Sequence, residues 1–224
     1  MLDKTEGIVL SFIRYRETSI ICKIYTEKFG IQSYIINGIR SKTGKTKIAL
    51  FQPLTLLDLV VYYRPELSIN RISEIRCINP FKSIAINTKK TAIALMLSEV
   101  LNKTLKEESE NSDLFTFIKQ SILFLDAQDE QFENFHLHFL LRLSSYFGIL
   151  PSSPEDMLSE RKKWIEEPEK SYINKLLQAG YGEHINMDNP TRRNLLNIIL
   201  NFYSIHIENF GELNSVKILR EVLS

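Results

Sequence analysis

Short runs of β-branched and aromatic residues dominate the first 80 residues of the chain, and turn-forming residues separate them. Such runs predict strands. In the second run, Ile20, Cys22 and Ile24 form a wholly apolar face, and the residues between them form a mixed face, as in a half-buried strand. We expect five strands, at Gly7–Tyr15, Thr18–Thr26, Gly30–Asn37, Leu54–Tyr63 and Leu67–Ile78.

Five short antiparallel strands have to pair or cover their edges, because an open edge is prone to unwanted pairing. A five-stranded, partly open barrel of oligonucleotide-binding (OB) type meets this need. An SH3-like barrel is the structural alternative. Gly30 follows Lys28–Phe29, a position that suits the positive φ of a tight turn.

The hydrophobic pattern changes to a helical period after Pro80. Gly148, with Pro151 shortly after it, is typical of the end of a helix, and Asn189–Pro190 is typical of a beginning. The polar segment Ser152–Lys170 is expected to hold a short helix within a loop. The expected helical segments are Thr88–Leu105, Leu114–Leu125, Phe132–Phe147, the apolar stretch Leu195–Phe202 and Leu213–Leu223.

The predicted fold class is therefore α+β. We expect a five-stranded OB-type barrel over residues 1–80 and an all-α domain over residues 81–224, with the boundary near Pro80. A chain of 224 residues is long enough for two modest domains.

Charge is distributed unevenly between these two parts. Residues 1–80 contain 12 Lys or Arg and 7 Asp or Glu, a balance of +5, so the remainder carries −4 of the total of +1. No acidic residue occurs between Lys28 and Asp58. If the protein binds a polyanion, we expect the N-terminal part to bind it.

The basic span contains Gly38 and Gly44 followed by Lys45–Thr46, an arrangement similar to a phosphate-binding P-loop. Five residues separate the two glycines, whereas the P-loop requires four, and Pro53 with a predicted strand follows instead of a long helix. Nucleotide hydrolysis is therefore not expected. The span is better interpreted as a basic loop that attracts phosphates, although a solvated hairpin tip has the same composition.

Aromatic residues lie among these charges, and stacking of a base on an aromatic ring contributes roughly 1–3 kcal/mol per base. Burial in the barrel core is the alternative role for each ring, and Tyr25, on the mixed face beside Lys23, is the best stacking candidate. The residues expected to contact DNA are Arg14, Arg16, Lys23, Tyr25, Arg40, Lys42, Lys45 and Lys47.

Metal binding and catalysis have no anchor in the sequence. Cys22 and Cys77 are far apart, and His136 and His138 are two residues apart on a predicted helix, so we assign these histidines to packing and to the helix surface. No catalytic motif, membrane-spanning run or secretory signal is recognisable. We expect a non-catalytic protein of the reducing cytoplasm, without cofactor or metal and without a membrane partner.

Several segments together resemble the RecO family of recombination mediators. In the N-terminal part these are Gly7–Leu10, Tyr15–Ile20, Tyr25–Gly30, Gly38–Arg40 and Gln52–Pro53. In the helical part they are Phe139–Leu143, Tyr146–Gly148, Pro151 and Ser215–Leu223. The order and spacing of these segments carry the resemblance, since each alone is unspecific.

The resemblance implies an OB-type barrel that binds single- and double-stranded DNA and anneals complementary strands without ATP. It also implies work with RecR and with single-stranded-DNA-binding protein (SSB), through the C-terminal tail of SSB, in loading a recombinase at the nucleoid. The alternative is an adaptor whose barrel binds partner subunits instead of nucleic acid.

The chain departs from the family pattern in one respect. Many members carry a four-cysteine zinc module after the helical motif, but Pro151–Ser171 contains no cysteine. We therefore expect a zinc-free branch, in which Trp164 and neighbouring apolar residues form a small substitute core.

Overall fold

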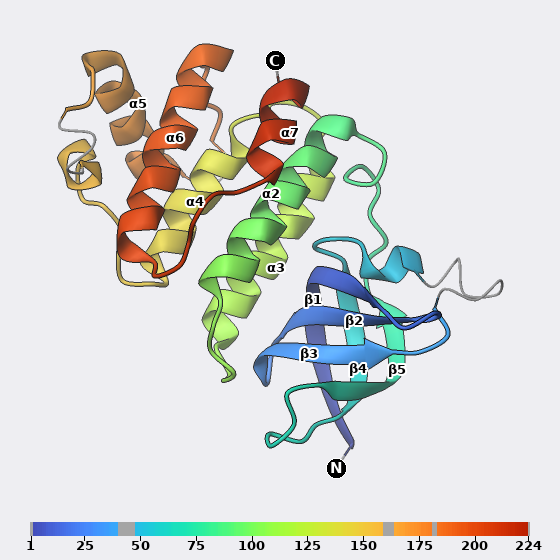
Figure 1. The fold of residues 1–224 in the computed structure, drawn as a ribbon. Coiled ribbons are helices and arrows are strands. Elements are labelled where there is room, and N and C mark those ends of the chain that lie inside the picture. Colours follow the sequence, from blue (N-terminus) through green and yellow to red (C-terminus); the bar gives the residue numbers. More distant parts are fainter. Residues whose placement is uncertain (1, 40–47, 159–163, 181–182, 224) are drawn as a thin grey trace. The chain divides into compact units, whose positions relative to one another are not determined.

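The structure is a computed structural model that describes residues 2–39, 48–158, 164–180 and 183–223 (Figure 1). It divides into two compact units, Met1–Ala127 and Gln128–Ser224. Unit 1 contains a β-barrel followed by two α-helices, and the described part of unit 2 contains four α-helices.

The barrel of unit 1 is closed, with the strand order β1-β2-β3-β5-β4. β3 and β5 pair in parallel, and the other neighbours pair antiparallel. This arrangement confirms the predicted α+β class and the OB-type barrel. The strands are β1 (Leu2–Tyr15), β2 (Ser19–Thr26), β3 (Gly30–Ile36), β4 (Leu56–Tyr62) and β5 (Asn70–Cys77), and the short 3-10 helix η1 (Ala49–Phe51) precedes β4.

β1 is longer than predicted, because its first residues continue the barrel despite their charges. Asp3 and Lys4 interrupt the apolar pattern, yet both pair with β4. A register shift between Val9 and Ser11 allows β1 to pair with β4 through its first half and with β2 through its second half. A single long strand thereby closes the barrel.

The barrel core is built from the face that the alternating pattern predicts. Ile20, Cys22 and Ile24 are fully buried, together with Tyr34 of β3 and Phe51 of η1. The intervening residues of β2 point outward. The predicted apolar face of this strand is therefore confirmed.

The helices α2 (Thr88–Thr104) and α3 (Ser112–Ala127) pack on the barrel within unit 1. The Ser98 hydroxyl of α2 donates a hydrogen bond to the carbonyl oxygen of Leu10 on β1. Lys119 of α3 forms an ion pair with Glu6 of β1. Both helices were predicted from their apolar periodicity, and both bind the same long strand.

Asp126, at the end of α3, holds the segment that connects β5 to α2. Its carboxylate accepts hydrogen bonds of 2.9 Å from the backbone N–H groups of Lys82, Ser83 and Ile84. Burial raises the pKa of this carboxyl, but these backbone donors outweigh burial and lower the pKa overall. The first turn after the barrel is thereby attached to the far end of α3.

Unit 2 is built from α4 (Phe135–Ser145), the 3-10 helix η2 (Pro154–Met157), α5 (Glu167–Gln178), α6 (Asn189–His206) and α7 (Ser215–Val222). Its core includes a hydrogen bond of 2.7 Å from the Tyr203 hydroxyl to the carbonyl oxygen of Leu140. Gly148 has a φ of +69°, as expected for a residue that ends a helix.

α5 was not predicted as a separate helix. It begins with Glu167 and Pro168, inside the polar segment Ser152–Lys170 for which we expected a short helix within a loop. Proline is well tolerated in the first helical turn, so Pro168 does not prevent the helix. Lys170 of α5 forms an ion pair of 2.9 Å with Glu155 of η2. This ion pair links the two helical pieces of the polar segment.

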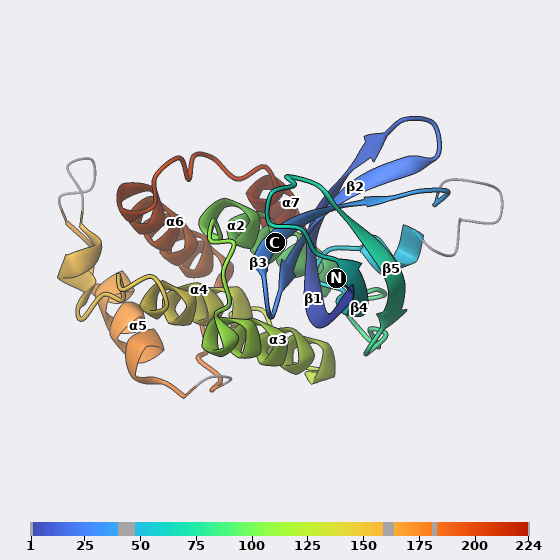
Figure 2. The same cartoon turned by 90° about the horizontal axis from the view of Figure 1, so that it is seen from below.

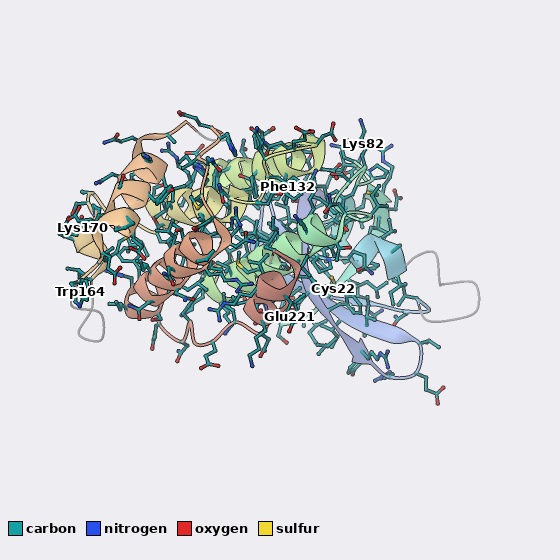
Figure 3. All side chains as sticks on the ribbon, turned by 90° about the horizontal axis from the view of Figure 1, so that it is seen from above. Cys22, Lys82, Phe132, Trp164, Lys170 and Glu221 are labelled. Atoms are coloured by element: carbon teal, nitrogen blue, oxygen red, sulfur yellow. The ribbon has the colours of Figure 1, made fainter. Side chains whose placement is uncertain are left out.

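Two expectations for unit 2 are wrong. His138 does not lie on a helix surface, since both His136 and His138 are buried on α4, where the neighbouring side chains are buried on every side. Trp164 does not form a substitute core, because 67% of its surface is exposed (labelled in Figure 3). Ile165 and Met157 fill the local core instead.

Candidate nucleic-acid interface

The β1–β2 hairpin presents two exposed arginines. Arg14 lies near the end of β1, and Arg16 lies in the turn with a positive φ of 51°. The Arg16 guanidinium lies 5.3 Å from the centre of the Tyr15 ring. Neither arginine forms an ion pair with another residue in the described ranges. Figure 2 shows the ends of β1 and β2 projecting beyond the other strands.

Lys23 lies on the outer face of β2, between Ser11 of β1 and Ser33 of β3 in the strand register. Its side chain is half-buried, and burial lowers its pKa. Lys23 is therefore only partly accessible on the outer face of the barrel.

Tyr25 is placed differently from expectation. It is only 3% exposed, and its ring centre lies 5.8 Å from that of Phe115 on α3. Burial, and secondarily the charge of Glu107, raise its pKa to about 12. A ring with so little exposure presents no face to a base, so the expected stacking role of Tyr25 conflicts with this structure.

The segment after α2 covers the same end of the outer face. The backbone N–H of Ile31 donates a hydrogen bond of 3.0 Å to the carbonyl oxygen of Glu107. Glu107, Glu108 and Glu110 are all exposed there. Within the described ranges, the outer face of β1–β3 is thus covered by an acidic segment near the β2–β3 turn and is open near the β1–β2 turn, where Ile13 and Arg14 are exposed.

The other four expected DNA contacts, Arg40, Lys42, Lys45 and Lys47, lie outside the described residues. A hydrogen bond fixes the position of Asn37, which precedes them in the chain. The Ser19 hydroxyl at the start of β2 donates this bond, of 2.9 Å, to the side-chain oxygen of Asn37. Asn37 therefore lies beside the β1–β2 turn, at the open end of the outer face.

Sequence reasoning missed a line of outward-facing side chains around the barrel, of which four are exposed and two, Ile21 and Ile35, are half-buried. Strand pairing makes successive neighbours of Leu2, Tyr62, Arg71, Ile35, Ile21 and Ile13, and we call this line the outer row. Its members come from all five strands. No sequence signal identifies the row, because its continuity depends on the register between strands that are distant in sequence.

The thiol and metal chemistry of the described residues is limited. Cys22 is buried in the barrel core, and burial raises the pKa of its thiol well above the ordinary value, which disfavours the reactive thiolate. No cluster of three or more His, Cys, Asp or Glu suited to a metal ion occurs in the part of the chain that the structure describes. Within the same ranges, no helix has the length and apolar character needed to span a bilayer.

These features define a class: a protein with an N-terminal OB-type barrel followed by helices, in which the barrel carries exposed cations. The family model "Recombination protein O N terminal" matches residues 1–81, and "Recombination protein O C terminal" matches residues 87–215. The chain belongs to the RecO family of DNA repair proteins.

Full-length relatives agree with this assignment. A protein of Bacteroides fragilis named "DNA repair protein RecO" is 37% identical over 240 aligned positions, covering 99% of both chains. Proteins of the same name from Phocaeicola vulgatus and Flavobacterium psychrophilum are 35% and 34% identical, each covering 100% of both chains.

Proposed function

We propose that this protein is a non-catalytic recombination mediator that binds single- and double-stranded DNA through its barrel. The observation that carries this proposal is a set of three cations on the outer face: the exposed Arg14 and Arg16 near the β1–β2 turn and the half-buried Lys23 of β2. The OB-type strand order supports it, because this class of barrel binds oligonucleotides on the face formed by its second and third strands.

The distribution of ion pairs strengthens the argument. Elsewhere on the barrel, Arg76 lies 3.7 Å from Asp58, and Glu6 pairs with Lys119. Carboxylates thus offset positive charge there, whereas Arg14 and Arg16 have no such partner in the described ranges. Cations without a carboxylate partner attract phosphate most strongly, so DNA is expected to bind at the hairpin side.

The basic sequence span supplies further cations close in sequence to this surface. Arg40, Lys42, Lys45 and Lys47 follow Asn37, which the structure places beside the β1–β2 turn. We propose that these residues add phosphate contacts to those of the hairpin.

A surface of this kind accelerates annealing without ATP, because neutralised phosphates reduce the repulsion between two complementary strands. Two strands held on one surface also meet at a raised effective concentration. On the basis of family membership, we further propose that the protein acts in the cytoplasm with RecR and with the C-terminal tail of SSB to load a recombinase.

Titration of a fluorescently labelled oligonucleotide with the full chain, over a series of salt concentrations, tests the binding proposal. We expect affinity to fall linearly with salt on logarithmic axes, for single-stranded and double-stranded DNA alike. An absence of oligonucleotide binding at low salt, combined with salt-insensitive binding of a partner protein, would establish the adaptor alternative instead.

A further inference from the structure

The outer face of β1–β3 changes from open to covered along its length. Near the β1–β2 turn, the outward-facing Ile13 is 63% exposed. Near the β2–β3 turn, Tyr25 and Ile31 also face outward, opposite each other in the strand register, yet they are only 3% and 6% exposed. Barrels of this class bind oligonucleotides on the face of their second and third strands, so one end of that face is occupied by the protein itself.

The cover is the connection between α2 and α3, residues 106–111, which we call the acidic segment. Its attachment is made by the backbone, because the carbonyl oxygen of Glu107 accepts a hydrogen bond of 3.0 Å from the N–H of Ile31. The carbonyl oxygens of Glu107 and Ser109 approach Gly30 so closely that a side chain on Gly30 would collide with them. The position of the segment therefore does not depend on its charged side chains.

The side chains that this connection exposes are mainly acidic. Burial is the larger cause of the raised pKa of Tyr25, and the charge of Glu107 adds to it, so this charge acts on the outer face. Carboxylates outnumber the ammonium groups at this end of the barrel. The exposed acidic residues are Glu107, Glu108, Glu110 and, in the first turn of α3, Asp113, and the exposed cations are Lys106 and, in the β2–β3 turn, Lys28.

We infer that the acidic segment is an electrostatic boundary of the DNA path: it repels phosphates from the β2–β3 end of the outer face and confines DNA to the end that carries Arg14 and Arg16. The inference rests on the proposed DNA binding and adds where the bound DNA stops. β2 has eight residues and is roughly 26 Å long, whereas the Debye length is about 10 Å at 0.1 M salt. Repulsion at one end therefore leaves the attraction at the other end intact.

A boundary of this kind assists a protein that anneals strands and then releases them. Every additional phosphate contact increases affinity and salt dependence, so a longer path on the barrel would hold the paired product more tightly. The acidic segment keeps the path short while the cations of the hairpin still attract DNA. Glu107, Glu108 and Glu110 are thus residues that limit the extent of binding.

The combined variant Glu107→Gln, Glu108→Gln and Glu110→Gln tests the repulsion. It removes three charges and retains the Glu107 carbonyl that holds Ile31, and circular dichroism checks that the fold is unchanged. We expect affinity for a labelled oligonucleotide to rise by about threefold or more at low salt. We also expect the magnitude of the salt slope for single strands to increase by about 0.7, the value for one further phosphate contact.

The matched control carries the same change in charge on unit 2. It combines Glu130→Gln, Glu166→Gln and Glu221→Gln, all at exposed positions. We expect its affinity and salt slope to stay close to those of the wild type. An equal gain in this control would show that net charge, and not the acidic segment, limits binding, and would overturn the inference.

Lys28 reports whether DNA passes the boundary, and this test also works in the wild-type background. We expect Lys28→Gln to leave wild-type binding almost unchanged, because the path ends before this residue, but to remove the added salt slope of the combined variant. Arg16→Gln, at the open end, should weaken binding in both backgrounds. Equal losses from Lys28→Gln and Arg16→Gln in the wild type would refute the boundary.

The same titrations separate this inference from the proposed function. Wild-type DNA binding with an unchanged affinity and slope in the combined glutamine variant would refute the boundary alone. No binding of single-stranded or duplex DNA by the wild type at low salt would refute the proposed function itself.

Discussion

The carbonyl oxygen of Glu107 accepts a hydrogen bond of 3.0 Å from the backbone N–H of Ile31, which joins the segment after α2 to the first residues of β3. This contact requires close approach at Gly30. A Cβ atom on Gly30 would lie 2.3 Å from the same Glu107 oxygen, and Gly30 also has a φ of +60°. Glycine is therefore required here both for its backbone conformation and for its lack of a side chain.

Replacing Gly30 by alanine should destabilise unit 1. We expect a loss of about 1–3 kcal/mol from backbone strain, with a further loss from the collision with backbone atoms. Gly38→Ala is the control, since Gly38 has a similar φ of +70° but no atom within 4 Å of an added Cβ. Urea unfolding followed by circular dichroism measures both variants, and equal shifts in midpoint would contradict a steric requirement at Gly30.

The covering of Tyr25 shows which parts of the site could be predicted from sequence. Alternation along β2 correctly placed Tyr25 on the outer face, because the two faces of a strand follow from its period. It could not show that Phe115 and the segment around Glu107 cover that end, since this contact joins residues distant in sequence. The five strands and the helical periods are local signals, and these predictions were confirmed.

The outer row was unpredictable for a related reason. Tyr62 and Arg71 become neighbours through the pairing of β4 with β5, and Leu2 belongs to a part of β1 whose charged residues concealed the strand pattern. The exposure of Arg14 and Arg16, in contrast, could be predicted from the sequence. Both lie at a hairpin turn, and such a turn exposes its side chains regardless of how the rest of the chain packs.

The basic span should make a measurable contribution to DNA affinity. Changing Arg40, Lys42, Lys45 and Lys47 together to alanine is expected to weaken binding and to reduce the magnitude of the salt slope by up to about 3–4, from roughly 0.7–0.9 per phosphate contact. Lys89, Lys106, Lys175 and Lys217, all exposed, provide a control with the same change in charge. Wild-type affinity and slope in the first variant would exclude these residues from the interface.

His136 should make the stability of unit 2 depend on pH. Burial, and secondarily the nearby Arg192 guanidinium, lower its pKa from 6.5 to about 3, while a hydrogen bond with the backbone at Glu133 raises it and the neighbouring His138 lowers it. As pH falls, His136 therefore becomes protonated in the unfolded chain at a higher pH than in the folded protein. The stabilising effect of neutral His136 is complete above pH 6.5 and is lost progressively below it.

The comparison of wild type with His136→Gln isolates this effect. We expect the wild type to lose up to about 1.4 kcal/mol more per pH unit than the variant as pH falls from about 6 to about 4. His184→Gln, at an exposed position, is the control. Parallel pH profiles for wild type and His136→Gln, measured by urea unfolding with Trp164 fluorescence, would show that His136 does not cause the dependence.

Zinc should not contribute to the stability of this chain. No cysteine occurs between Pro151 and Ser171, where a four-cysteine module would lie. We expect elemental analysis of the purified protein to find no stoichiometric zinc, and a chelator to leave the melting temperature unchanged. One tightly bound zinc ion per chain would show that other residues replace the missing thiolates.

The annealing of two labelled complementary oligonucleotides, followed by fluorescence with and without protein and ATP across a salt series, tests the central claim most directly. We predict faster annealing without ATP, suppressed by salt in parallel with binding, because charge neutralisation on the barrel drives the step. An absolute requirement for ATP, or no acceleration when both strands are demonstrably bound, would contradict the account.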